Sequence, residues 1–198
     1  MRPIKEKKER SLGTKLFIKS DRCNSPKCVT IRRPHRPGEH GKKRHQVSEY
    51  GRELQEKQKV QLVYGLSNRQ MTSLFKENKE KIFRTLETRL DRVVHLLGIT
   101  KSPRVARQMV SHGHILVNGR KVTIPSYRVN IGDIISVRPE SKAMKIFEDA
   151  PLKAKTFSPP SWLKVEVPDF KGSCVQKPEF DKKKFSFDLD LVGQFYSR

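Results

Sequence analysis

Residues 102–124 read SPRVARQMVSHGHILVNGRKVTI, and this stretch decides the fold of the middle of the chain. Ser102-Pro103 has the form of a helix N-cap followed by proline at the first helical position. Apolar residues then recur at helical spacing until Gly113, which predicts a short helix. Asn118-Gly119 separates two runs rich in apolar residues, 114–117 and 120–124, and is the strongest two-residue signal for a β-hairpin. The stretch therefore predicts a short helix that leads directly into a hairpin.

The flanking sequence predicts the partners of this helix and hairpin. Upstream, apolar residues recur at helical spacing from about Lys79 to Leu97, and Gly98 follows as a stop, which predicts one long helix. Downstream, a turn at residues 131–133 leads into a strand at residues 134–137. We predict an α+β fold in which two helices pack on a small antiparallel sheet.

Two further helices are predicted before this region. Ser48 can cap a helix that Gly65 ends, since glycine readily adopts the left-handed conformation found after a helix. Residues 67–70, Ser-Asn-Arg-Gln, form a capping box at the start of the next helix. The chain thus divides into an arm (1–47), a helical domain (48–88), a helix-and-sheet domain (89–139) and a C-terminal extension (140–198) that packs against either domain.

The charge of the chain indicates a polyanionic partner. Its 198 residues hold 43 Lys and Arg against 21 Asp and Glu, a formal net charge of +22. A compact body with such an excess repels itself, whereas binding to nucleic acid neutralises the excess and releases counterions. Residues 1–48 carry +11 of this charge and show no sustained periodicity. We predict that the arm is irregular and folds largely on its partner.

Several other classes of protein are disfavoured. The sequence lacks an apolar run of the roughly 18 residues that indicate a membrane span, and its first residues lack the apolar core of a secretory signal. Its three cysteines do not make a disulfide framework, so we expect a reducing, cytosol-like compartment and no membrane partner. The extension has little periodicity and no convergent catalytic set, and its alternating run around Asp188 and Asp190 predicts an exposed strand or an extended face. We predict that the chain is not an enzyme.

A series of motifs runs along the middle of the chain in a familiar order. They are RLDRVV at 89–94, LG at 97–98, ARQ at 106–108, HGHILVNGR at 112–120, IPSY at 124–127 and GD at 132–133. Together they resemble the RNA-binding motif named after ribosomal protein S4. The flanking motifs are KLFIK at 15–19, CNSPKC at 23–28, PGEHG at 37–41, SEYG at 48–51, EKQKV at 56–60, YG at 64–65, PSWL at 160–163 and FYSR at 195–198. They resemble the bacterial or organellar S4 family itself, over nearly the whole chain.

The resemblance implies a structural constituent of the small ribosomal subunit and a primary binder of its RNA. Members of the family dock on a multi-helix junction in the 5′ domain of 16S-type rRNA and nucleate assembly of the surrounding body. They also lie where messenger RNA enters the subunit, beside its third and fifth proteins, and affect decoding accuracy. The expected location is the ribosome in the cytoplasm, with an organellar stroma or matrix left open.

The candidate binding residues combine the resemblance with the properties of the side chains. Donors on the short helix and the hairpin can follow phosphates and 2′-hydroxyls across a shallow RNA minor groove. The predicted rRNA-binding residues are Arg32, Arg33, Tyr50, Arg52, Lys57, Lys59, Arg69, Arg92, Ser102, Arg104, Arg107, Gln108, Ser111, His112, His114, Asn118 and Arg120. The resemblance places Lys42, Lys43 and Arg44 near messenger RNA.

We predict no zinc and no other cofactor. Many members of the family bind zinc through an early and a later pair of cysteines. This chain keeps only the later pair, Cys23 and Cys28, and two thiolates do not close a tetrahedral structural site. His35 and His40 are the weak candidates to complete it. Cys174 is predicted to be an ordinary residue of a polar segment.

Two rival functions use the same motif. One is an RNA-modifying enzyme, which would need a catalytic domain of substantial length. The other is a free-standing, stress-related RNA binder, which would need neither the arm nor the Phe-Tyr-Ser-Arg end. Co-sedimentation with small subunits through a high-salt wash favours the ribosomal protein, and a free pool favours the rivals.

Overall fold

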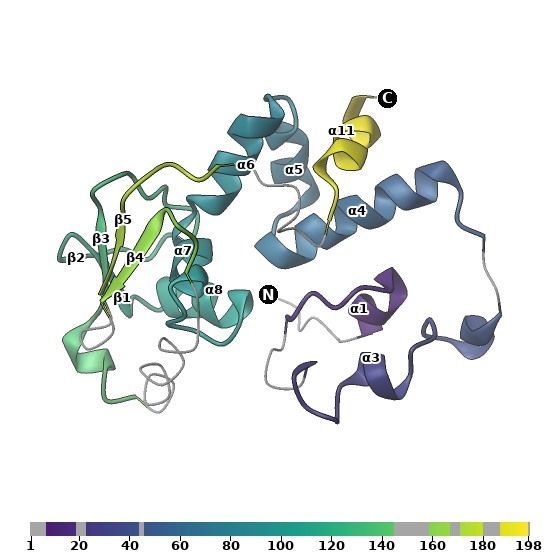
Figure 1. Cartoon of the computed structure of the whole chain (residues 1–198), viewed down its shortest axis with the longest axis horizontal. Coiled ribbons are helices and arrows are strands. Elements are labelled where there is room, and N and C mark those ends of the chain that lie inside the picture. Colours follow the sequence, from purple (N-terminus) through teal and green to yellow (C-terminus); the bar gives the residue numbers. More distant parts are fainter. Residues whose placement is uncertain are drawn as a thin grey trace. The chain divides into compact units, whose positions relative to one another are not determined.

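The structure is a computed structural model that describes residues 7–18, 23–43, 46–144, 159–166, 171–179 and 187–197. The chain forms two compact units. The first unit comprises residues 1–79 and 181–198, and the second comprises residues 80–180 (Figure 1). The predicted α+β class is confirmed, because both units contain helices and the second holds an antiparallel sheet.

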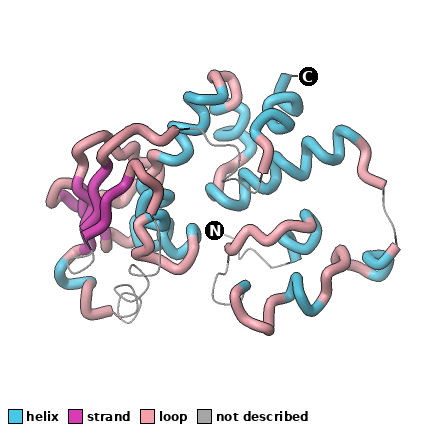
Figure 2. The backbone as a smooth tube through the Cα atoms, viewed as in Figure 1, coloured by secondary structure: helices cyan, strands magenta, loops and turns pink. Residues whose placement is uncertain are grey.

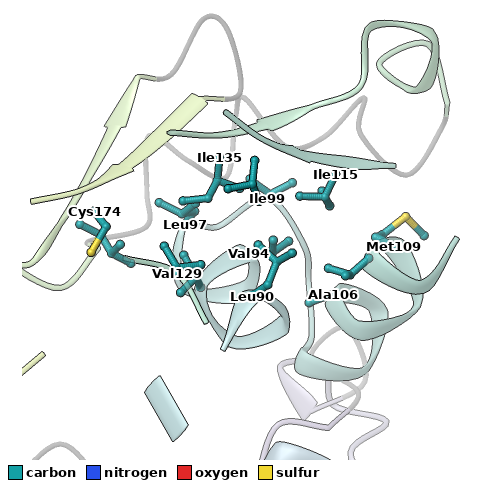
Figure 3. Close-up of a cluster of buried hydrophobic side chains, with 14 of the residues drawn as sticks. Leu90, Val94, Leu97, Ile99, Ala106, Met109, Ile115, Val129, Ile135 and Cys174 are labelled. Atoms are coloured by element: carbon teal, nitrogen blue, oxygen red, sulfur yellow. The ribbon is translucent and has the colours of Figure 1, made fainter. Parts of the chain in front are cut away.

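The second unit is built around a sheet of five antiparallel strands in the order β2-β1-β3-β5-β4 (Figure 2). Its elements are α7 (Leu90–Leu96), α8 (Pro103–Ser111), β1 (Ile115–Val117), β2 (Arg120–Lys121), β3 (Ile134–Val137), η2 (Pro139–Ser141), β4 (Leu163–Glu166) and β5 (Lys171–Cys174). Both helices contribute to one apolar core with the sheet. Figure 3 shows Leu90 and Val94 of α7, and Leu97 directly after it, directed toward Ile115 and Ile135 of the sheet.

The predicted hairpin is present and has the expected turn. Asn118 and Gly119 have φ angles of 50° and 77°, as a two-residue turn with both central residues in the left-handed region requires. The Asn118 amide also ties this turn to the next one: its Nδ2 donates to Asp133 at 2.8 Å, and its Oδ1 accepts from the Ile134 amide at 2.9 Å. Strand β2 is shorter than predicted and ends at Lys121.

The prediction of one helix from Lys79 to Leu97 was wrong. The segment forms α6 (Lys79–Glu87) and α7, separated by an extended Arg89 with φ −62° and ψ 137°. Backbone hydrogen bonds to a distant segment replace helical ones at this break. The Leu90 amide donates to the Tyr127 carbonyl, and the Val129 amide donates to the Thr88 carbonyl, both at 2.8 Å. Tertiary pairing therefore overrides a helical pattern that is locally continuous.

Strands β4 and β5 were not predicted, and they add the C-terminal extension to the sheet. Gly172 of β5 lies so close to Leu97 that a Cβ atom at this position would fall 2.4 Å from the leucine Cδ2. The prediction for Cys174 was wrong, because this cysteine is only 3% exposed and belongs to the core. Burial, followed by the nearby Asp133 carboxylate, raises the pKa of its thiol.

The helices of the first unit begin and end largely as predicted. They are α1 (Lys7–Leu12), α3 (Val29–Arg32), η1 (Glu39–Lys42), α4 (Glu49–Tyr64), α5 (Asn68–Leu74) and α11 (Leu189–Ser197). The Ser48 hydroxyl accepts from the Gly51 amide at 3.2 Å, and Gly65 ends α4 with a φ of 61°. Both hydrogen bonds of the capping box between Ser67 and Gln70 are present at the start of α5.

The prediction of an exposed, extended segment around Asp188 and Asp190 was wrong, because helix α11 begins at Leu189. Asp190 lies in its first turn and pairs with Lys79. The Asp188 amide donates to the Glu56 carboxylate of α4 at 2.9 Å, and α11 packs along α4. Leu189 and Leu191 of the alternating run therefore belong to a helix that packs along another helix.

The described parts of the arm are more ordered than predicted. Leu12, Leu16 and Ile18 are buried together against Leu62 and Val63 of α4. The described residues of the arm include the short helices α1 and α3 and the 3-10 helix η1, so the arm is not wholly irregular. Among the described residues, no helix is long and apolar enough to cross a membrane.

Candidate nucleic-acid interface

Helix α8 carries the first group of predicted RNA-binding residues. The Ser102 hydroxyl caps the helix, accepting from the Val105 amide at 3.4 Å, and Ser102 is buried. Arg104 is half-buried, whereas Gln108 and Ser111 are exposed. The amphipathic pattern explains this division, because Ala106, Met109 and Val110 take the face toward the core. The helix therefore presents a polar outer face and uses Ser102 for its own start.

Arg107 of α8 is held by a buried ion pair beneath it. Arg89 donates to both oxygens of Asp91, from Nε at 3.0 Å and from Nη2 at 2.7 Å, and both side chains are buried. Nη1 of Arg107 lies 3.5 Å from the same carboxylate. Burial lowers the pKa of Arg107, the Asp91 charge raises it and the Arg89 charge lowers it further, with a net decrease. Asp91 thus fixes the direction of a guanidinium that is still partly open to solvent.

The hairpin and the turn before it carry the next group. His112 is exposed and follows α8, and its ring centroid lies 6.0 Å from that of His114. His114 is half-buried, and its Nδ1 lies 2.9 Å from the Ser141 hydroxyl of η2. Burial lowers the pKa of His114, and the charges of His112, Arg138 and Lys121 lower it further. His112, His114, Lys121 and Arg138 thus lie close enough for their charges to interact, and we call these four residues the cationic cluster.

Two members of this cluster were not among the predicted residues. Lys121 is exposed at the end of β2, and Arg138 follows β3 and donates its backbone amide to the His114 carbonyl at 2.9 Å. Ile115 pairs with Val137, so residues 114 and 138 are neighbours across the two strands. The hairpin motif alone does not specify this second pairing. A register assumed for the strand at 134–137 could have pointed to Arg138.

The remaining hairpin candidates differ in what they can offer. Arg120 is exposed at the start of β2. The Asn118 amide group is engaged in the two turns described above, so its contribution is to hold the hairpin tip. The guanidinium of Arg92 in α7 donates to the Glu87 carboxylate at 3.1 Å and is mostly buried. Arg92 and Asn118 are therefore better placed to position the surface than to contact a ligand.

The other predicted residues lie in the first unit. Arg32, Arg33, Lys42, Lys43, Arg52 and Arg69 are exposed, whereas Arg44 lies outside the described residues. Lys59 is half-buried and pairs with Glu56 at 2.6 Å. Nζ of Lys57 lies 4.3 Å from the centroid of the Phe195 ring, which also contacts Tyr50 at a centroid distance of 5.6 Å. The predicted residues are thus distributed over both units, and one group of them gathers around α8 and the hairpin.

The weak metal candidates differ in exposure. Cys23 and Cys28 are buried, His35 is half-buried and His40 is exposed. Burial raises the pKa of the Cys28 thiol, but hydrogen bonds from Ile31 and Thr30 and the charge of Lys15 outweigh it and give a net decrease. Within the described ranges, no three His, Cys, Asp or Glu side chains gather as metal ligands would.

The basic surface of α8 and the hairpin is typical of a nucleic-acid-binding protein, and the comparison with known proteins agrees with this class. Residues 88–135, which hold α7, α8, β1, β2 and the start of β3, match the S4 domain. Residues 2–97 match the ribosomal protein S4/S9 N-terminal domain. Among curated relatives, small ribosomal subunit protein uS4 of Halothermothrix orenii is 42% identical over 193 residues, covering 94% of this chain and 93% of the relative. Those of Thermus thermophilus (over 196 residues) and Clostridium botulinum (uS4A, over 193) are also 42% identical, with the same coverage. The chain belongs to the ribosomal protein S4 family.

Proposed function

We propose that this protein is a structural component of the small ribosomal subunit that binds rRNA and has no catalytic role. The cationic surface formed by α8 and the hairpin of its S4 domain carries this proposal. Helix α8 carries Arg104, Arg107 and Gln108, and the turn between this helix and the hairpin carries His112 and His114. Such donors suit phosphates and 2′-hydroxyls along a shallow minor groove, which are read by shape more than by sequence.

The finer role rests on the resemblance together with the charge. The protein docks on a junction in the 5′ domain of 16S-type rRNA and nucleates assembly of the body around it. The arm supports this role, because residues 1–48 hold +11 of the +22 net charge and its exposed cations can follow a folded RNA. Lys42, Lys43 and Arg44 contribute to the channel through which messenger RNA enters. The neighbouring third and fifth proteins of the small subunit complete this environment and link it to decoding accuracy.

The contacts divide into those that touch RNA and those that shape the surface. We assign direct contact to candidates that are exposed and to three half-buried ones on the α8 and hairpin surface, Arg104, Arg107 and His114. The exposed ones are Arg32, Arg33, Tyr50, Arg52, Arg69, Gln108, Ser111, His112 and Arg120. Lys57, Lys59, Arg92, Ser102 and Asn118 contact other groups of the protein, so they position the surface.

Binding to a 5′-domain fragment of 16S-type rRNA tests this function directly. The full chain should bind the fragment more tightly than an unrelated RNA of equal length, as measured by filter binding at a fixed salt concentration. It should also co-sediment with small subunits through a high-salt wash. A chain that binds both RNAs equally and stays in a free pool would contradict the proposal and favour a free-standing RNA binder.

The variant Arg107→Ala tests the surface of the S4 domain. Loss of one phosphate contact should weaken binding and reduce the slope of log K against log salt by about one. Lys164→Ala is the matched control, because this exposed lysine of β4 carries the same charge in the same unit. An equal reduction in both variants would mean that net charge, and not the α8 surface, determines the slope.

We further propose that the arm binds no zinc, because only two of the cysteines that hold the metal in many relatives are present. Elemental analysis of chain purified without chelator should find far less than one zinc per chain. About one zinc per chain, lost in Cys28→Ser, would overturn this proposal. His40→Asn would then test whether a histidine completes the site.

A further inference from the structure

The cationic cluster at the end of the hairpin brings together groups from four successive elements. His112 follows α8, His114 precedes β1, Lys121 ends β2 and Arg138 follows β3. The chain stays close together here because Gly113 has a φ of 77°, and a Cβ atom at this position would meet the Lys121 side chain. The lysine therefore lies over the turn that separates the two histidines.

The surroundings of His114 leave one of its ring nitrogens available. Nδ1 faces the Ser141 hydroxyl at 2.9 Å, whereas Nε2 has no hydrogen-bond partner within the described part of the chain. The charged groups that act on the ring are His112, Lys121 and Arg138. Arg138 also pairs with Glu140, an exposed residue, so one carboxylate lies at the edge of the cluster. Repulsion among the cations is reduced when an anion joins them.

We propose that His112, His114, Lys121 and Arg138 form a seat for one backbone phosphate of rRNA, and that His114 takes up a proton when the phosphate binds. This inference rests on the proposed function and specifies how one part of that surface works. The proton ends on a ring nitrogen of His114, solvent supplies it, and no covalent bond to the phosphate forms. The Ser141 hydroxyl keeps the ring oriented in both states.

The direction of the pH dependence follows from this coupling. In the free protein, burial and the neighbouring cations hold the pKa of His114 below its ordinary value of 6.5. A bound phosphate favours the charged ring and raises that pKa. Below the pKa of the free protein the ring is protonated in both states, so affinity is highest and constant. As the pH rises from there to the pKa of the complex, binding requires a proton from solvent and affinity falls. Above that pKa it is constant again.

Binding of the full chain to the 5′-domain fragment between pH 5.5 and pH 8 tests the seat. At constant salt, affinity should fall by about five- to tenfold across this range, where each tenfold corresponds to one pH unit of difference between the two pKa values. His114→Asn, compared in a His112→Asn background so that His114 is the one histidine of the site that changes, should bind more weakly at pH 5.5 and lose most of the pH dependence that remains. Lys121→Met should lower affinity about three- to tenfold, and Lys164→Met, on the exposed β4 strand, should not.

A second measurement does not depend on any variant. The NMR titration of the His114 ring in the wild-type chain should move its midpoint upward by about one pH unit when the RNA fragment is bound. An unmoved midpoint, or a pH dependence that His114→Asn retains in the His112→Asn background, would overturn the proton-linked seat while RNA binding persists. Absence of specific RNA binding at every pH would instead overturn the proposed function itself.

Discussion

The S4 domain and the arm are stabilised by different kinds of interaction. The second unit has a continuous apolar core shared by α7, α8 and the sheet, with one buried ion pair, Arg89–Asp91, at its edge. In the described residues of the arm, the apolar cluster packed against α4 is small and consists of Leu12, Leu16 and Ile18. A region with so few apolar contacts needs other interactions to offset its loss of conformational entropy.

Charged side chains supply those interactions in the arm. Oε1 of Glu9, a buried residue, accepts from the amides of Leu16 and Ile18 at 3.1 and 3.2 Å. The next residue, Arg10, donates to the carbonyls of Arg33, His35 and Arg36, with its shortest contact at 2.9 Å. Two consecutive residues of α1 thus bind the backbone of two later segments, residues 16–18 and 33–36. Charge shapes the arm itself, whereas in the S4 domain most of the order comes from apolar burial.

The largest expected effect comes from breaking the buried ion pair of the S4 domain. Arg89→Ala should lower the free energy of unfolding of this unit by about 3 kcal/mol, since it leaves Asp91 buried with Arg107 as its nearest remaining cation. Urea unfolding followed by fluorescence of Trp162, the chain's one tryptophan, reports on this unit because Trp162 lies in its core.

Arg84→Ala is the matched control for that measurement. Arg84 and Glu80 form an exposed pair in α6 with an N–O distance of 3.7 Å, so its removal should change stability by less than about 0.5 kcal/mol. Equal effects of the two variants would show that burial of the Arg89–Asp91 pair does not determine its contribution.

The contrast between local and tertiary interactions explains which elements could be predicted from the sequence and which could not. Ser48, Gly65 and the Asn118-Gly119 turn were predicted because each of them satisfies or directs backbone groups only a few residues away. The break at Arg89 was missed because the partners of its neighbours lie at residues 125–129, beyond any local pattern. Strands β4 and β5 have four residues each, too few for alternation to stand out.

The same limit applies to the candidate site. Arg107 and His114 could be predicted from a helix face and a hairpin motif, but Arg138 joins them only through the pairing of β1 with β3. Likewise, the arm's charge pointed to a nucleic acid, whereas the folding role of Glu9 and Arg10 depends on contacts up to 26 residues away.

A smaller effect is expected from removing the carboxylate of the arm. Glu9→Leu leaves the Leu16 and Ile18 amides without their acceptor, which should cost about 1–3 kcal/mol of local stability. Hydrogen exchange of these two amides should accelerate by roughly five- to a hundredfold, while exchange in the S4 domain stays unchanged. Glu39→Leu, at an exposed position of η1, should leave both amides protected. Equal acceleration in both variants would indicate that the arm responds to net charge alone.

The smallest expected change in stability comes from a glycine of the first unit, and a glycine of the second unit provides the contrast. Gly193 lies within α11, and a Cβ atom there would meet no atom within 4 Å, so Gly193→Ala should stabilise the first unit by about 0.5–1 kcal/mol through helix propensity. Gly172→Ala should instead destabilise the second unit by about 1–3 kcal/mol, because the added methyl group overlaps Leu97 in a filled core. Amide exchange in α4 and α11 measures the first change, and Trp162 fluorescence in urea measures the second. Changes of the same sign would contradict the contrast between an open helix surface and a close-packed sheet, because backbone flexibility alone would then govern both positions.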